Sequence, residues 1–111
     1  ADLVEAAAAD VRAGVPVGVV AARFHHGLAA ALVELVDAAR SGCGLSTVAL
    51  TGGVLQNVTL LGELAEGLSA RGFEVLTHTR VPPNDGGISL GQAAVAAARD
   101  RAGLLGRTPA P

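Results

Sequence analysis

Apolar residues recur at three- and four-residue spacing through roughly the first forty positions, and this spacing is the helical period. The first apolar run, residues 3–13, ends at Gly14, which readily takes the left-handed conformation that closes a helix. Pro16 suits the first turn of a second helix, which we expect to stop near Ser41-Gly42. The predicted buried stripe of this second helix is Phe24, Leu28, Leu32, Leu35, Val36 and Ala39. The pattern therefore predicts two helices before the first strand.

A strand, a helix and a second strand are predicted next. Residues 45–50 form a short, largely apolar run with β-branched residues, as expected for a buried parallel strand. After a turn at Gly52-Gly53 the helical period resumes at Val54 and ends at Gly72. The predicted buried face of this helix is Val54, Leu55, Val58, Leu61, Leu64, Ala65 and Leu68. Residues 73–77 form the second strand, and two strands joined by a helix within about thirty residues predict a right-handed crossover with parallel strands.

The last predicted helix covers residues 85–101 and is rich in alanine. Residues 103–111 show no periodicity, so we expect a flexible C-terminal tail after a folded domain over residues 1–102. The predicted fold is α/β, in the order ααβαβα, with a two-stranded parallel βαβ unit. Sheets usually have at least about four strands. We therefore expect an apolar edge or face to pack against another lobe or chain.

Composition narrows the possible partners and mechanisms. Half of the 111 residues are hydrophobic but only two are aromatic, which predicts a core of Ala, Val and Leu. The formal net charge of −2 and the lack of a basic run predict no nucleic-acid partner and no anionic membrane surface. No uninterrupted apolar run approaches the ~20 residues that span a bilayer. All eight basic residues are arginine, which excludes a lysine Schiff base and a Walker lysine.

The start of the chain and its cysteine content bear on where the protein works. The single cysteine, Cys43, cannot form an internal disulfide, so we expect a reducing, cytoplasmic setting. The N-terminus lacks the basic and apolar regions of a signal peptide. Because the sequence begins at Ala1 rather than at methionine, we expect a segment of a longer protein.

The turn at Gly52-Gly53 is the first candidate binding site. Free N–H groups at a helix N-terminus, with no side chains in the way, allow close approach of a phosphate or a ribose. Asn57 is expected about one turn into the following helix, where its amide could bind the same ligand. The alternative is that the glycines only make a tight turn and that Asn57 is a solvated helix residue; short glycine motifs favour this alternative.

Asp85 is the second candidate. Its carboxylate could cap the last helix, which is a common role, or could offer a hard oxygen ligand to a divalent metal. The following Gly86-Gly87 favours the metal, because a cap alone does not need two glycines that leave room for a ligand or for backbone. Both roles could coexist.

The remaining reactive side chains are expected to be bystanders. His25 and His26 are adjacent, so on a helix they project about 100° apart and cannot bind one ion together. We expect these histidines and His78 to be ordinary, partly exposed residues. Cys43 lies between two glycines in a turn, and Ser89 lacks the G-x-S-x-G sequence of a nucleophile elbow.

Several motifs in a fixed order resemble one family. They are Phe24-His25 opening a helix, LTGGVLQN at residues 50–57, RGFEVLTH at 71–78 and VPPNDGGISLGQ at 81–92. Together they resemble the C-terminal end of HypF, a family of carbamoyltransferases that mature nickel–iron hydrogenases. The resemblance covers roughly residues 16–102. It implies the second lobe of an actin-like (ribonuclease H-like) ATPase domain, similar to tRNA threonylcarbamoyl-transferases and antibiotic O-carbamoyltransferases.

The resemblance also implies a role for each candidate residue. Gly52 and Gly53 match glycines that lie against the nucleotide, Asn57 matches an asparagine that binds it, and Asp85 matches the acidic ligand of a divalent metal. The other metal ligands in the family are two histidines of an H-x-x-x-H motif in the preceding lobe. That motif is missing from this sequence, as are the acylphosphatase-like, zinc-finger and YrdC-like domains of HypF.

The implied reaction has two stages. Carbamoyl phosphate and ATP give carbamoyl-adenylate, and the carbamoyl group then passes to the C-terminal cysteine of the partner HypE. We expect this chain to be inactive alone and to work with the N-terminal lobe and upstream domains of a parent protein. Two alternatives are a lobe of a small-molecule O-carbamoyltransferase and a non-catalytic interaction module.

Overall fold

The computed structural model describes residues 3–104, so residues 105–111 of the predicted tail lie outside the described residues. The elements, in chain order, are the helices α1 (Leu3–Arg12) and α2 (Val17–Cys43), the strand β1 (Thr47–Ala49), the 3₁₀ helix η1 (Gly53–Gln56), the helix α3 (Val58–Ala70), the strand β2 (Glu74–Leu76), the 3₁₀ helix η2 (Asp85–Gly87) and the helix α4 (Ile88–Arg101). The predicted α/β class is confirmed. The two 3₁₀ helices were not predicted.

The sheet has two parallel strands, as the sequence predicted. Val48 of β1 is paired with Val75 of β2, and α3 forms the crossover between the strands. Gly72, which ends the turn after α3, has a φ of +79°. A left-handed residue at this position is the usual helix ending that the sequence indicated.

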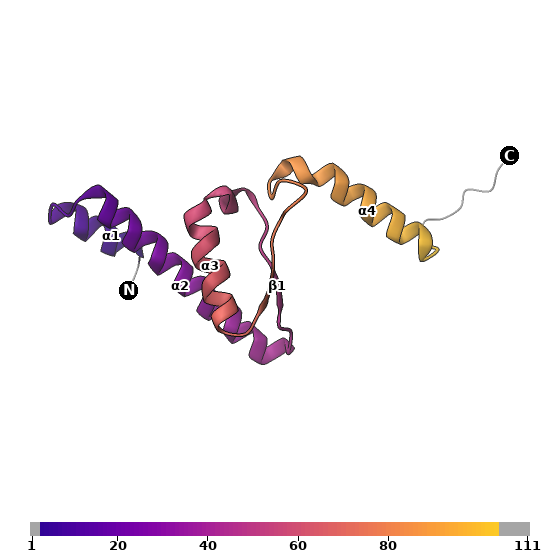
Figure 1. The fold of residues 1–111 in the computed structure, drawn as a ribbon, viewed down its shortest axis with the longest axis horizontal. Helices are drawn as coiled ribbons and strands as arrows, with labels where there is room; N and C mark the ends of the chain where they lie inside the picture. Colours follow the sequence, from indigo (N-terminus) through magenta and orange to yellow (C-terminus); the bar gives the residue numbers. More distant parts are fainter. Residues whose placement is uncertain (1–2, 105–111) are drawn as a thin grey trace.

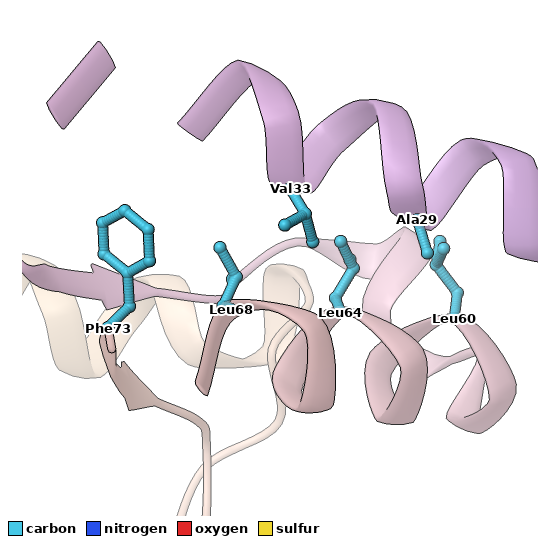
Figure 2. Packing of buried hydrophobic residues seen from close by; sticks show 6 residues of the cluster. All are labelled: Ala29, Val33, Leu60, Leu64, Leu68 and Phe73. Atoms are coloured by element: carbon cyan, nitrogen blue, oxygen red, sulfur yellow. The ribbon is translucent and has the colours of Figure 1, made fainter. Parts of the chain in front are cut away.

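The core lies between α2, α3 and the start of β2 (Figure 2). Its buried members are Ala29, Val33, Leu60, Leu64, Leu68 and Phe73. The predicted stripe of α2 was therefore wrong in part, because α3 packs on Ala29 and Val33 while Leu35 is 66% exposed. A Cβ atom at Gly67 would lie 2.9 Å from Cγ2 of Val33, so small residues let the two helices approach closely.

The predicted buried face of α3 was also wrong in part. Leu64 and Leu68 are buried, as predicted, but Val54 and Val58 are largely exposed and the buried Leu60 was missed. The physical reason is that η1 precedes the α-helix, which begins only at Val58. The apolar face therefore rotates relative to a continuous helix from Val54.

A charged cluster joins the ends of α2 and α3. The carboxylate of Asp37 accepts from Arg40 and, at 3.0 Å, from Nη1 of Arg71. Nη1 of Arg40 donates to the backbone carbonyl of Arg71 at 2.9 Å, and the Arg40 guanidinium lies 4.1 Å from the centre of the Phe73 ring. This cluster fixes the start of β2 against α2.

The helix α4 extends away from the rest of the molecule, beyond the sheet from α3 (Figure 1). None of its residues is buried, and Ile88, Leu90 and Val95 are each about half exposed. The described residues span 74 × 30 × 23 Å with a radius of gyration of 19.7 Å. A compact domain of this length would have a radius of about 13 Å. The chain is therefore elongated, with an apolar helix that the described residues leave uncovered.

The length and composition of α2 would also suit a membrane span, with 27 residues and a hydropathy of 1.4 over its most apolar window. This finding qualifies the expectation from sequence that no long apolar segment is present. It is weak evidence for a membrane, because a core helix has the same composition. Ala29 and Val33 of α2 are buried against α3, but only 11% of that window is buried within the described residues.

Candidate functional site

A cavity of about 430 Å³ lies at the carboxyl ends of the two parallel strands. Ligands of α/β proteins are commonly bound at this edge of a sheet. The backbone N–H of Gly52, after β1, donates to the carbonyl of Pro83, after β2, at 2.8 Å. Nε2 of His78 lies 2.9 Å from Oγ1 of Thr51. These two contacts hold the two loops together, and both loops line the cavity.

The two glycines of the first loop differ in what they require. Gly52 has a φ of +111°, a backbone conformation that residues with a side chain rarely adopt. Gly53 has no such φ, and a Cβ atom there would meet only Cβ of Asn84, at 4.0 Å. The backbone explains the glycine at position 52. Neither backbone strain nor packing within the described residues explains the glycine at position 53.

Backbone donors are free beside these glycines. Leu55 N–H donates to the carbonyl of Gly52 at 3.1 Å, as in a 3₁₀ turn. The N–H groups of Gly53 and Val54 donate to no acceptor among the described residues. Unpaired donors on an open cavity suit an anionic or hydroxyl-bearing ligand.

Asp85 lines the same cavity from the second loop. Its side chain is exposed and makes no hydrogen bond or ion pair with residues 3–104. The helix cap considered for Asp85 is instead Asn84, whose Oδ1 accepts from the N–H of Gly86 at 3.0 Å. The cap interpretation of Asp85 was therefore wrong, and its carboxylate is left available to a ligand.

Gly86 and Gly87 let the loop of residues 82–87 fold closely on itself. A Cβ atom at Gly87 would lie 3.0 Å from the carbonyl oxygen of Pro82, and one at Gly86 would lie 3.0 Å from Cγ of Pro82. Both distances are tighter than almost all real contacts. Of the two reasons that the sequence suggested for this glycine pair, the structure favours close approach of backbone.

Asn57 is not one turn into a helix, as the sequence suggested, but is the N-cap of α3. Its Oδ1 accepts from the N–H groups of Thr59 and Leu60, both at 3.1 Å. Its Nδ2 lies 2.7 Å from Nε2 of His25 on α2. Asn57 does not line the cavity of Gly52, Gly53 and Asp85. The structure thus brings three of the four predicted residues into one cavity and places the fourth at the far end of η1.

The sequence did not predict two contacts that histidines make in the structure. His25 and Asn57 are 32 residues apart in the chain, and His78 and Thr51 are 27 apart. No spacing rule predicts such pairs, because they depend on how α2 packs and on the strand register. His26, by contrast, is exposed and faces Glu63, with Nδ1 3.7 Å from Oε2.

The described residues do not complete a metal site. Within residues 3–104, no three His, Cys, Asp or Glu side chains lie close enough to hold one ion. The free carboxylate of Asp85 is a suitable oxygen ligand, but one carboxylate alone is a weak site. A metal bound here would need ligands from another part of the protein.

The parallel strands, the glycine turn and the carboxylate define a lobe of an α/β protein with an open cavity at the carboxyl ends of its strands. Residues 1–92 match the family described as "Carbamoyltransferase, Kae1-like Domain, second subdomain". The match covers most of the chain, so the chain belongs to the HypF family of carbamoyltransferases as this second subdomain.

Individual relatives agree with this assignment. A "Carbamoyltransferase HypF homolog" of Cupriavidus necator is 46% identical over 88 residues, which are 79% of this chain and 22% of that protein. The HypF carbamoyltransferase of Rhizobium leguminosarum is 42% identical over 75% of this chain and 11% of that protein. A crystal structure of full-length HypF in the phosphate- and nucleotide-bound form matches with a TM-score of 0.68 and 44% identity. That match covers 71% of this chain and 10% of the other chain.

The chain therefore spans between about a tenth and a fifth of the length of these relatives. Most of the length of each relative therefore lies outside the matched segment.

Proposed function

We propose that this chain is the second lobe of an actin-like carbamoyltransferase domain and forms part of its nucleotide and metal site. The observation that carries the proposal is the single cavity shared by the Gly52-Gly53 turn and the free carboxylate of Asp85. The membership in the HypF family supports the same assignment. The uncovered face of α4 suits packing against the first lobe.

In this proposal, ATP and carbamoyl-adenylate lie against Gly52 and Gly53. The free N–H groups of Gly53 and Val54 donate to the ligand, and the missing side chain at position 53 gives it room. Asn57 contacts the nucleotide through its amide nitrogen, since its oxygen is already occupied by the helix cap. Donors fixed before the ligand arrives lose little entropy on binding.

Asp85 is proposed as one ligand of a divalent metal, completed by histidines outside this chain. Its exposed carboxylate on the cavity fits this role. When bound, such an ion supplies Lewis-acid polarisation of a carbonyl and a template for the substrate. This lobe then needs neither a lysine nor a nucleophile of its own.

The reaction of the complete protein would convert carbamoyl phosphate, ATP and water into carbamoyl-adenylate, phosphate and pyrophosphate. In the second stage, the thiolate of the C-terminal cysteine of HypE attacks the carbamoyl carbon. The bond from that carbon to the adenylate oxygen breaks, and AMP leaves with the electron pair. We assign this chemistry to hydrogenase maturation in the cytoplasm, with the preceding lobe and upstream domains of the parent protein as partners.

The experiment that tests the proposal is Asp85→Ala in a full-length HypF that carries these residues. Because the side chain of Asp85 is exposed and makes no hydrogen bond or ion pair with residues 3–104, the unfolding temperature should stay the same. Carbamoyl transfer to the acceptor should be lost. Glu66→Ala, an exposed carboxylate on α3 outside this cavity, is the matched control and should keep full activity. Full activity of Asp85→Ala would remove the metal role.

A further inference from the structure

His25 makes two hydrogen bonds that together define the tautomer of its neutral ring. Its Nδ1 lies 2.8 Å from the backbone carbonyl of Ala21, one turn earlier in α2. A carbonyl oxygen only accepts, so Nδ1 carries the proton. In the neutral ring Nε2 is then an acceptor, and it lies 2.7 Å from Nδ2 of Asn57.

The orientation of the Asn57 amide is fixed independently. Its Oδ1 accepts two backbone N–H groups at the start of α3, so the amide cannot be turned over without setting donors against donors. Nδ2 must therefore face His25. The amide nitrogen carries two hydrogens, of which His25 accepts one and no described residue accepts the other.

The His25 ring is itself held in place. It is half-buried and meets the Phe24 ring edge to face, with centroids 6.4 Å apart. Its helix, α2, packs against α3 through the buried core of Ala29 and Val33. The ring is therefore attached to a helix that contributes to the buried core, which is suitable for fixing another side chain.

We infer that His25 is a positioning residue, which holds the Asn57 amide so that its second N–H points to the nucleotide. The inference rests on the proposed nucleotide role of Asn57. Without the acceptor on His25, the oxygen of Asn57 would still cap α3, but the amide would lose one of its two fixed directions. The nucleotide would then have to order the amide on binding, which weakens affinity.

The test uses full-length HypF carrying these residues and measures ATP affinity by calorimetry together with the KM for ATP and kcat. His25→Leu removes the acceptor and should weaken ATP binding about threefold to tenfold, as for one net hydrogen bond. The loss should appear mainly in KM. His25→Gln offers an amide oxygen near the position of Nε2 and should restore affinity to within about twofold of the original protein. His26→Leu, at the exposed neighbouring position, should change nothing.

Asn57→Ser separates this inference from the proposed function. Serine keeps a helix cap but cannot reach His25 or a ligand in the same way. If Asn57→Ser leaves ATP affinity unchanged, the nucleotide role of Asn57 is wrong. If Asn57→Ser weakens binding and His25→Leu does not, only the positioning role is wrong. Equal losses in His25→Gln and His25→Leu would also overturn it.

The double variant His25→Leu with Asn57→Ser gives a further check. Because His25 acts through Asn57, the double variant should bind ATP no more weakly than Asn57→Ser alone. Additive losses would show that His25 acts on the nucleotide by another route and would contradict the inference.

Discussion

The two halves of this molecule are stabilised in different ways. Among the described residues 3–104, all the buried ones lie within residues 17–76, where α2 and α3 pack on each other and on the start of β2. Residues 81–101 contribute none of the buried core, and α4 is exposed along its whole length. Hydrophobic burial thus holds the first half together, whereas the second half carries apolar residues without a partner among the described residues. The candidate site lies where the two halves meet.

This difference indicates which features serve the fold and which serve the function. In the first half, close contacts explain small residues such as Gly67, which approaches Val33. At the junction, the open space around Gly53 and the free carboxylate of Asp85 have no such explanation. We expect this difference in a lobe whose site is completed by another domain: packing explains the residues of the core, but not those of the site.

The largest expected effect tests the packed half. Leu68 has no exposed surface, so Leu68→Ala should lower the free energy of unfolding of the purified chain by about 2–5 kcal/mol. Val95 on α4 is 48% exposed, and Val95→Ala should change the free energy of unfolding by less than about 0.5 kcal/mol. Urea denaturation measures both. A similar loss for the two variants would mean that α4 belongs to the same core.

The second prediction separates the adjacent glycines. Gly52→Ala forces a side chain into a φ of +111° and should destabilise the chain by about 1–2 kcal/mol. Gly53→Ala should leave the stability unchanged or slightly raised, because alanine reduces the freedom of the unfolded chain. Thermal unfolding of the two variants side by side checks this. Equal destabilisation would mean that position 53 is also constrained by the fold.

The third prediction concerns the helix cap. Asn57→Ala removes the acceptor for two N–H groups of α3 and should lower the free energy of unfolding by about 1 kcal/mol. Asn57→Ser should retain most of the stability that the cap contributes, because serine caps a helix nearly as well as asparagine. Denaturant titration distinguishes the variants. If Asn57→Ala and Asn57→Ser had the same free energy of unfolding, the side-chain cap would contribute little to stability.

The smallest expected effect is at the charged cluster. Its side chains are each about one-third exposed, so Asp37→Ala should cost no more than about 1 kcal/mol, and less in high salt. Glu34→Ala, on the exposed side of α2 and outside the cluster, is the control. A salt-independent loss of several kcal/mol would show that the cluster is more deeply desolvated than its exposure indicates.

Local sequence signals predicted the elements well and their buried faces only in part. Gly14 and Gly72 mark turns after helices because both have positive φ, and the strand–turn–helix–strand pattern predicted the parallel pair. The position of η1 was not predictable, since a 3₁₀ helix and the first turn of an α-helix share the same apolar spacing. The faces of α2 and α3 were displaced for this reason and because small residues lie at their contact.

The site was predictable only where its residues are adjacent in the sequence. Gly52 and Gly53, and Asp85 with its glycines, stood out as local motifs. Their common cavity depends on the hydrogen bond from the N–H of Gly52 to the carbonyl of Pro83. This hydrogen bond forms only once the strands are paired in parallel. The contact of His25 with Asn57 likewise requires the packing of α2 on α3. Such long-range pairs leave no periodic signal in one sequence.

The most direct test of the central claim is ATP binding by Gly53→Ala in a full-length HypF that carries these residues. Calorimetry should show about a tenfold weaker affinity with an unchanged unfolding temperature, since about 1.4 kcal/mol of lost binding corresponds to a factor of ten. Gly62→Ala on α3 is the matched control, because the space beside it is also open and it lies outside the cavity. Unchanged ATP affinity in Gly53→Ala would contradict the claim that a nucleotide lies against this turn.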